Sequence, residues 1–175
     1  MKFTKTNIKG VYVITLELRN DTRGSFTRNF CKKEFTEAGI NIDIVQINRS
    51  LTREKGTIRG LHYQRYPKSE DKIVQCLKGS IFDVAVDLRK NSPTYGKWVG
   101  ETLSEDNNKM LLIPKGFAHG FQALENEVVV QYFVSQYYSP DYEKGLRWND
   151  PLLNIQWPIK NAKLSDKDKQ WPYMS

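Results

Sequence analysis

The histidines are the first residues to consider for acid–base chemistry, because the 175-residue chain contains only two. His62 lies in the segment 56–64 (GTIRGLHYQ), which alternates as a strand does and carries Arg59 three positions earlier. His119 lies in the segment 113–121 (IPKGFAHGF), which is rich in glycine and apolar residues. Histidine is the side chain best suited to take and return a proton near neutral pH. The chain therefore has few other places for such chemistry.

Several other kinds of chemistry have no support in the sequence. Jelly-roll metal sites commonly use a His-x-His pair, whereas the two histidines here are 57 positions apart, and first-row metals need three or four ligands. The glycine-rich motifs of dinucleotide and nucleoside triphosphate sites are missing. Cys31 and Cys76 have no paired spacing and adjoin no histidine, so free thiols are expected. We therefore predict no metal and no organic cofactor, which leaves cofactor-free proton transfer.

Cofactor-free proton transfer needs a base, an acid and a donor that stabilises a developing oxyanion. His62 can be the base, Tyr132 in the apolar run 128–134 can be the acid, and Lys72 at the start of a strand can stabilise an enolate. Each also has an ordinary structural explanation: a hydrogen-bonded core histidine, a core tyrosine and a solvated strand end. Sequence spacing alone does not bring the three together.

Composition limits the class of protein. The chain is long enough for one domain, 1–175, and its 39% hydrophobic and 27% charged residues are typical of a soluble globular protein. No apolar run approaches the roughly 18 residues of a membrane span, and no signal peptide is recognisable, so a cytoplasmic location without membrane contact is expected. The net charge of +7 favours an anionic partner. Basic and acidic residues are interspersed, as in 51–55 (LTREK), which favours a phosphorylated small molecule over nucleic acid.

The elements that must position these residues are mostly strands. Seven segments are short, rich in β-branched residues and separated by turn residues: 11–16, 42–48, 72–77, 80–88, 97–103, 110–113 and 128–134. One short helix is expected over 32–39, with Gly39 as its stop, and the chain from Ser139 onward looks irregular. This spacing predicts an all-β sandwich or jelly roll with a few short helices.

Many collinear blocks carry a family resemblance. They are 22–26 (TRGSF), 46–48 (QIN), 59–64 (RGLHYQ), 83–89 (DVAVDLR), 92–96 (SPTYG), 113–121 (IPKGFAHGF), 148–151 (WNDP), 155–158 (IQWP) and 164–168 (LSDKD). On these blocks the chain resembles the dTDP-4-dehydrorhamnose 3,5-epimerase family over nearly its whole length. The resemblance implies a metal-free, cupin-like jelly roll (a double-stranded β-helix) that forms a homodimer. It also implies inversion at C3, C5 or both beside the C4 ketone of a nucleotide-diphospho-4-keto sugar, for deoxysugars of lipopolysaccharide or capsule.

The resemblance also assigns roles to residues. His62 matches the base, Asp168 the carboxylate that orients it, Tyr132 the tyrosine on the opposite face of the sugar and Lys72 the enolate-stabilising lysine. The other positions that it places against the substrate are Arg23, Phe26, Arg28, Gln46, Asn48, Arg59, His119, Tyr138, Glu143 and Lys167. Among them, Arg23, Arg59 and His119 would meet the diphosphate, and Phe26 and Tyr138 would pack against the base.

Three departures from the family pattern concern the substrate. Arg28 replaces a glutamate that accepts a hydrogen bond from thymine, and arginine has donors only, which suit the O6 and N7 acceptors of guanine. The usual A-Q-x-K reads 69–72 (SEDK), and Phe133 replaces a lysine. The alternatives are a single-site epimerase of a GDP- or CDP-linked 4-keto sugar such as a heptose, and a non-catalytic jelly-roll module that binds sugar nucleotides.

Overall fold

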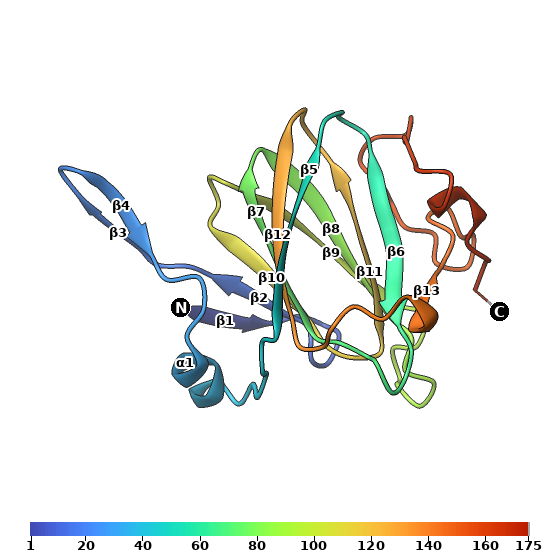
Figure 1. The fold of residues 1–175 in the computed structure, drawn as a ribbon, viewed down its shortest axis with the longest axis horizontal. Helices are drawn as coiled ribbons and strands as arrows, with labels where there is room; N and C mark the ends of the chain where they lie inside the picture. Colours follow the sequence, from blue (N-terminus) through green and yellow to red (C-terminus); the bar gives the residue numbers. More distant parts are fainter. Residues whose placement is uncertain (175) are drawn as a thin grey trace.

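The computed structural model describes residues 1–174 and consists of two antiparallel sheets that face each other, with a hairpin projecting to one side (Figure 1). One sheet has six strands in the order β1 (Lys2–Lys5), β2 (Tyr12–Thr15), β10 (Lys109–Ile113), β7 (Lys72–Lys78), β12 (Val128–Val134) and β5 (Gln46–Thr52). The other has five, in the order β13 (Glu143–Gly145), β6 (Ile58–Gln64), β11 (Phe117–Ala123), β8 (Ser80–Asp87) and β9 (Trp98–Ser104). This architecture confirms the predicted all-β, cupin-like jelly roll.

Three apolar clusters hold the layers together. The first fills the space between the sheets and includes Val74, Leu111 and Phe121. The second packs Phe35, from α1 (Lys32–Glu37), against the outer face of the six-stranded sheet. The third covers the outer face of the five-stranded sheet with C-terminal residues that include Leu153. Because burial of apolar surface contributes roughly 25 cal/mol per Å², both faces of both sheets add to stability.

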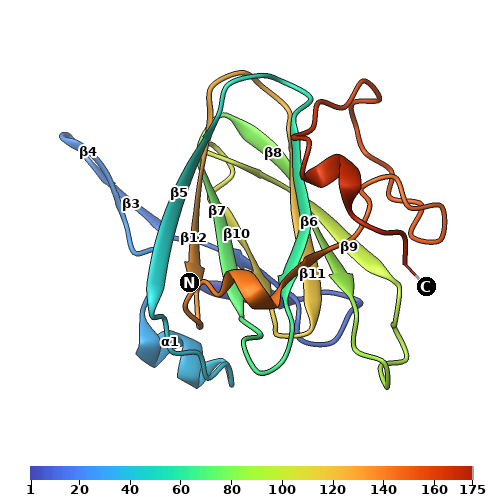
Figure 2. The same ribbon diagram turned by 45° about the vertical axis from the view of Figure 1, so that its right-hand side comes forward.

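The C-terminal chain explains why β8 is buried on both faces. Ile81 and Ala85 face the core between the sheets, whereas Val84 and Val86 face the C-terminal segment. That segment contains two 3-10 turns, η1 (Pro140–Tyr142) and η2 (Asp168–Gln170), and follows the irregular course that we predict from the sequence. It folds against the five-stranded sheet and so brings η2 close to β6 (Figure 2).

The N-terminal part differs most from the sequence prediction. β3 (Leu18–Asp21) and β4 (Gly24–Thr27) form a two-stranded hairpin that stands away from both sheets (Figure 1). The predicted strand 42–48 is correct only from Gln46, because Ile42 and Ile44 pack into the cluster around Phe35 instead of joining a ladder. The predicted helix 32–39 is confirmed in shorter form, with Gly39 at φ +77° after its end.

Two further expectations concern the cysteines and membrane-spanning helices. Cys31 and Cys76 are free, as expected, and burial raises the pKa of Cys76 to about 12. Among residues 1–174, no helix is long and apolar enough to cross a membrane.

Candidate active site

The three candidate catalytic side chains meet in one cleft between the two sheets. His62 comes from β6 of the five-stranded sheet, and Lys72 and Tyr132 come from β7 and β12 of the six-stranded sheet. The cleft has two chambers, of about 460 Å³ and about 340 Å³, and all three side chains line both. The fold therefore brings together residues that sequence spacing leaves apart. The candidate base and the candidate acid come from β6 and β12, which belong to the two facing sheets (Figure 2).

A bulge in β6 aims Arg59 and His62 into the same cleft. Side chains three residues apart in a regular strand point to opposite faces. The register of β6 against β11 shifts between these two positions, and such a bulge re-aims side chains. Gly60 lies in the shift at φ +132°, and a Cβ atom there would approach Gly120 Cα to 2.5 Å. Only glycine fits at this position, so the glycine before His62 is part of how the site is built.

His62 is held by a buried carboxylate. Its Nε2 lies 2.5 Å from Oδ1 of Asp168, which belongs to η2 at the far end of the chain. Burial opposes ionisation of Asp168, but hydrogen bonds from His62, the Gly60 N–H and the Trp171 indole outweigh it, so the pKa of Asp168 lies below its usual range. An ionised carboxylate accepts only, so Nε2 carries the proton. This tautomer leaves the lone pair of Nδ1 for proton transfer.

Tyr132 and Lys72 are neighbours on the opposite wall. In the ladder between β12 and β7, Tyr132 pairs with Val74 and Val134 pairs with Lys72. Burial raises the pKa of Tyr132, and the negative charge of Glu70 adds to the rise while Arg59 opposes it. Tyr132 therefore stays protonated at neutral pH, as a proton donor must. Lys72 Nζ forms an ion pair of 2.9 Å with Oε1 of Glu70.

A second histidine–carboxylate pair lies beside the first. His119 is the strand partner of His62, and its Nε2 lies 2.7 Å from Oδ1 of Asp83. Asp83 is fully buried, and desolvation raises its pKa, partly offset by His119. Its other oxygen has no hydrogen-bond partner within the described residues. None of the roles predicted from the sequence falls on Asp83. The signal for its pairing is its place as an acid among the apolar residues of segment 80–88.

The two chambers differ in charge. The larger one, which we call the basic chamber, is lined by Arg59, His119 and Lys167 in addition to the shared residues. Arg59 is fixed by hydrogen bonds to the Thr52 hydroxyl (2.9 Å) and the Leu51 carbonyl (2.9 Å). The arginine and lysine cations of this chamber suit a diphosphate.

The smaller one, the acidic chamber, contains the carboxylates Glu70 and Glu143. Its other lining residues are mostly amides and tyrosines: Gln46, Asn48, Tyr63, Gln64, Val134 and Tyr138. Glu143 accepts hydrogen bonds from Lys167 Nζ (2.7 Å) and the Tyr138 hydroxyl (2.8 Å), which outweigh burial and lower its pKa. Acceptors and amides in this chamber suit hydroxyl groups.

Three predicted substrate residues lie elsewhere in the chain. Arg23, Phe26 and Arg28 belong to the hairpin or follow it, and none of them lines either chamber. Phe26 and Arg23 are largely exposed, and Arg23 pairs with Asp21. Arg28 is hydrogen-bonded to Oε1 of Glu34 at 2.9 Å. Within one chain, the fold thus brings together the predicted catalytic residues and leaves this group outside.

Metal binding has no visible support in the part of the chain that the structure describes. Among residues 1–174, no group of three or more His, Cys, Asp and Glu side chains is placed to hold a metal ion. The absence of a metal requirement stays a prediction.

A jelly roll with a histidine–carboxylate pair facing a tyrosine, next to a basic chamber, fits an epimerase that works by proton transfer. Residues 5–175 match the model of the dTDP-4-dehydrorhamnose 3,5-epimerase family. The Shigella flexneri relative of that name is 47% identical over 169 residues, covering 96% of this chain and 93% of its own. The chain belongs to the dTDP-4-dehydrorhamnose 3,5-epimerase family.

Solved structures of the family have the same fold. The Bacillus anthracis enzyme, crystallised with TDP and pyrophosphate, is 46% identical with a TM-score of 0.96, covering 99% of both chains. The Legionella pneumophila enzyme, in complex with dTDP-4-keto-L-rhamnose, is 40% identical with a TM-score of 0.94, covering 98% of this chain and 92% of its own. The prediction of a nucleotide-sugar epimerase is therefore confirmed.

Proposed function

We propose that the enzyme inverts C3 and C5 of a dTDP-linked 4-keto-6-deoxy sugar, with His62 as base and Tyr132 as acid. The observation that carries these roles is their placement: His62, which is paired with Asp168 of η2, and Tyr132 come from facing sheets and line one cleft. Inversion requires one face of the sugar carbon to lose a proton and the other to gain one. Such opposed groups serve that need, whereas binding alone does not require them.

The proton transfers balance around an enolate. His62 Nδ1 takes the proton from the carbon next to the ketone, and the electron pair of the broken C–H bond is delocalised onto the C4 oxygen as an enolate. The ammonium group of Lys72 stabilises that oxygen, as preorganised donors do in such sites. Tyr132 then donates its proton to the opposite face, and the ketone reforms. Solvent returns a proton to Tyr132 and removes one from His62, so the enzyme is unchanged after each inversion.

The basic chamber is proposed to hold the diphosphate. Arg59 and Lys167 supply cations there and His119 a ring nitrogen, and the family structure with TDP and pyrophosphate shows that relatives bind such groups. The acidic chamber then receives hydroxyl groups of the sugar. We keep the cytoplasmic location and the supply of deoxysugars for surface polysaccharide as predictions of the same proposal.

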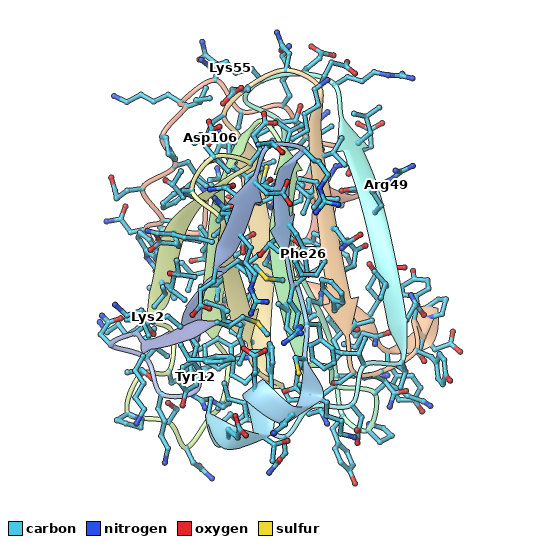
Figure 3. The ribbon with its side chains drawn as sticks, turned by 90° about the vertical axis from the view of Figure 1, so that its left-hand side faces the viewer. Lys2, Tyr12, Phe26, Arg49, Lys55 and Asp106 are labelled. Atoms are coloured by element: carbon cyan, nitrogen blue, oxygen red, sulfur yellow. The ribbon has the colours of Figure 1, made fainter. Side chains whose placement is uncertain are left out.

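We further propose a homodimer in which the hairpin of one chain completes the cleft of the other. The alternation of β5 supports this arrangement, because its polar residues Gln46 and Asn48 face the cleft while the apolar Ile47 and Leu51 are exposed. Figure 3 looks onto this outer face, where Phe26 lies near the centre and Arg49 points outward from β5. The exposed row of β5 is Ile47, Arg49 and Leu51, and apolar side chains exposed on a sheet face are typical of an interface that a second chain buries.

Solvent exchange tests the proposed reaction. The enzyme is incubated with dTDP-4-keto-6-deoxyglucose in heavy water, and deuterium is measured at C3 and C5 separately. Incorporation at both carbons with inversion is expected. Incorporation at one carbon supports the single-site alternative, and faster turnover of the GDP- or CDP-linked sugar supports the other nucleotides. Binding without exchange of any of the three would contradict the proposal and leave a non-catalytic module.

A further inference from the structure

Trp171 contacts the same carboxylate oxygen that holds His62. Its indole Nε1 donates a hydrogen bond to Oδ1 of Asp168 at 3.2 Å, and His62 Nε2 lies 2.5 Å from that oxygen. Asp168 begins the 3-10 turn η2 and Trp171 directly follows it, and side chains three residues apart in such a turn lie on one face. The turn therefore presents both the carboxylate and the indole to His62.

The indole also fills the space beside the imidazole. Gly145 of β13 is the strand partner of His62, and paired residues direct their side chains to one face of a sheet. A Cβ atom on Gly145 would approach Cδ2 and Cε2 of Trp171 to 2.4 Å. The ring centroids of Trp171 and His62 are 6.1 Å apart with an interplanar angle of 67°, which is an edge-on arrangement. The indole therefore takes the place next to His62 that a side chain at position 145 would have.

Contacts outside the cleft hold Trp171 in this position. Arg147 Nε donates to the Trp171 carbonyl at 2.8 Å, and the Arg147 N–H donates to the Pro172 carbonyl at 2.8 Å. Lys167 Nζ lies 5.7 Å from the centroid of the indole ring, within the range of a cation–π contact. Trp171 itself lines neither chamber. The indole can therefore support Asp168 and His62 without contacting a bound substrate.

We propose that Trp171 is a positioning residue of the epimerase, which fixes the Asp168 carboxylate and, through it, the ring of His62. A carboxylate can rotate about its Cβ–Cγ bond, and the indole N–H restrains that rotation together with His62 and the Gly60 N–H. The consequence for the rate rests on the proposed function, since His62 must be the base. A misplacement of about 1 Å can cost about 100-fold in rate, so such restraint affects turnover.

Trp171→Phe tests the indole N–H, because it keeps an aromatic ring and loses only the donor. The matched control is Trp98→Phe at the opposite edge of the same sheet, which loses an indole hydrogen bond to the Leu153 carbonyl (2.9 Å) and lines neither chamber. A hydrogen bond to a charged group is worth about 10-fold or more. We expect Trp171→Phe to lower kcat about 10-fold with KM within about twofold, and Trp98→Phe to change neither beyond about twofold. Equal losses in both variants, or a change mainly in KM, would overturn the inference.

A double-mutant cycle tests the place of the indole next to His62. Gly145 is not among the glycines with positive φ in the described chain, so alanine there meets the indole but strains no backbone. Gly145→Ala should displace the indole and lower kcat about 10-fold or more, as loss of its hydrogen bond does. In Trp171→Ala the same methyl group meets no ring, so Gly145→Ala should add at most about twofold to the loss. Losses that multiply in the double variant would contradict this arrangement.

A ligand-free measurement separates this inference from the proposed function. The chain has only two histidines, so in protein labelled with ¹⁵N in the imidazole rings the signals missing from His62→Asn belong to His62. In the wild type, neutral His62 should carry its proton on Nε2 and give two widely separated ring ¹⁵N shifts.

In Trp171→Ala the carboxylate rotates and the two tautomers mix, so the two shifts should converge, whereas in Trp98→Phe they should stay apart. Unchanged shifts in Trp171→Ala would overturn the inference even if epimerisation is confirmed. Absent turnover in the wild type would refute the proposed function, while this experiment still decides the role of Trp171. If Trp171→Ala does not fold, Trp171→Phe takes its place in the measurement, with the same expected direction.

Discussion

The residues predicted to bind or convert the substrate lie in two regions, the cleft and the hairpin. The two regions differ in how firmly one chain holds their side chains. In the cleft, His62 is fixed by Asp168, Lys72 by Glu70 and Arg59 by the β5 edge, all within one chain. In the hairpin, Phe26 is 62% exposed and the Arg23 side chain 88% exposed, and neither lines the cleft. One chain thus brings the proton-transfer residues together, whereas Arg23 and Phe26 of the hairpin stay exposed to solvent.

This difference suits two separate tasks: proton transfer in the cleft and nucleotide recognition by the hairpin. Proton transfer needs groups held within a fraction of an ångström, which packed sheets provide. Recognition of a nucleotide tolerates residues from a second chain, provided that the interface is stable. Variants in the cleft should therefore lower the rate of the chemical step, whereas variants in the hairpin should weaken binding.

The largest effect is expected from His62→Asn. Removing a general base typically costs about 100- to 10,000-fold in rate, and solvent exchange at both carbons should fall by that factor while nucleotide binding stays nearly unchanged. Deuterium incorporation and calorimetry with dTDP measure the two properties. Exchange at the wild-type rate in this variant would contradict the assignment of His62 as the general base.

The next effect tests whether the hairpin works in the partner's cleft. The double variant Arg23→Ala/Phe26→Ala loses a phosphate contact and a stacking contact, the latter worth about 1–3 kcal/mol in comparable sites. Mixing it with His62→Asn subunits and allowing exchange should recover about a quarter of the wild-type activity, because half of the dimers then contain one intact site. No recovery, or a monomer by light scattering at micromolar concentration, would refute the shared site.

A smaller effect is expected from Arg28→Glu. Arg28 is paired with Glu34 and offers no acceptor to a thymine N–H. One unmade buried hydrogen bond costs roughly 1–3 kcal/mol, or about 5- to 150-fold in affinity. We expect Arg28→Glu, which supplies the missing acceptor, to raise the affinity for dTDP relative to GDP and CDP. Calorimetry with GDP, CDP and dTDP measures both proteins, and equal affinities throughout would leave Arg28 without a role in base choice.

The smallest expected effect is that of a chelator. The described residues contain no cluster suited to a metal ion, and the proposed steps use only side chains of the protein. Chelator-treated enzyme should keep full activity. Loss of activity that one specific metal restores would contradict this expectation. It would indicate that a metal ion, and not Lys72, stabilises the enolate.

Strand patterns were predicted well where apolar residues repeat and poorly where tertiary contacts decide. Segment 128–134 is a strand over its full predicted length, since both its faces meet apolar clusters. The hairpin was missed because 18–27 is polar and exposed, without the alternation that a buried face imposes. The pairing of Asp83 with His119 was missed because it joins two strands 36 positions apart.

The sequence by itself determined the jelly-roll class, the family and the residue types of the proton-transfer set. These follow from local periodicity and from collinear motifs, which a chain carries whether or not it is folded. Only the tertiary structure decided that His62 and Tyr132 lie on facing sheets, that a bulge turns Arg59 beside His62, and that Glu70 pairs with Lys72. Such relations depend on strand register and on contacts between distant segments, and linear spacing does not encode either one locally.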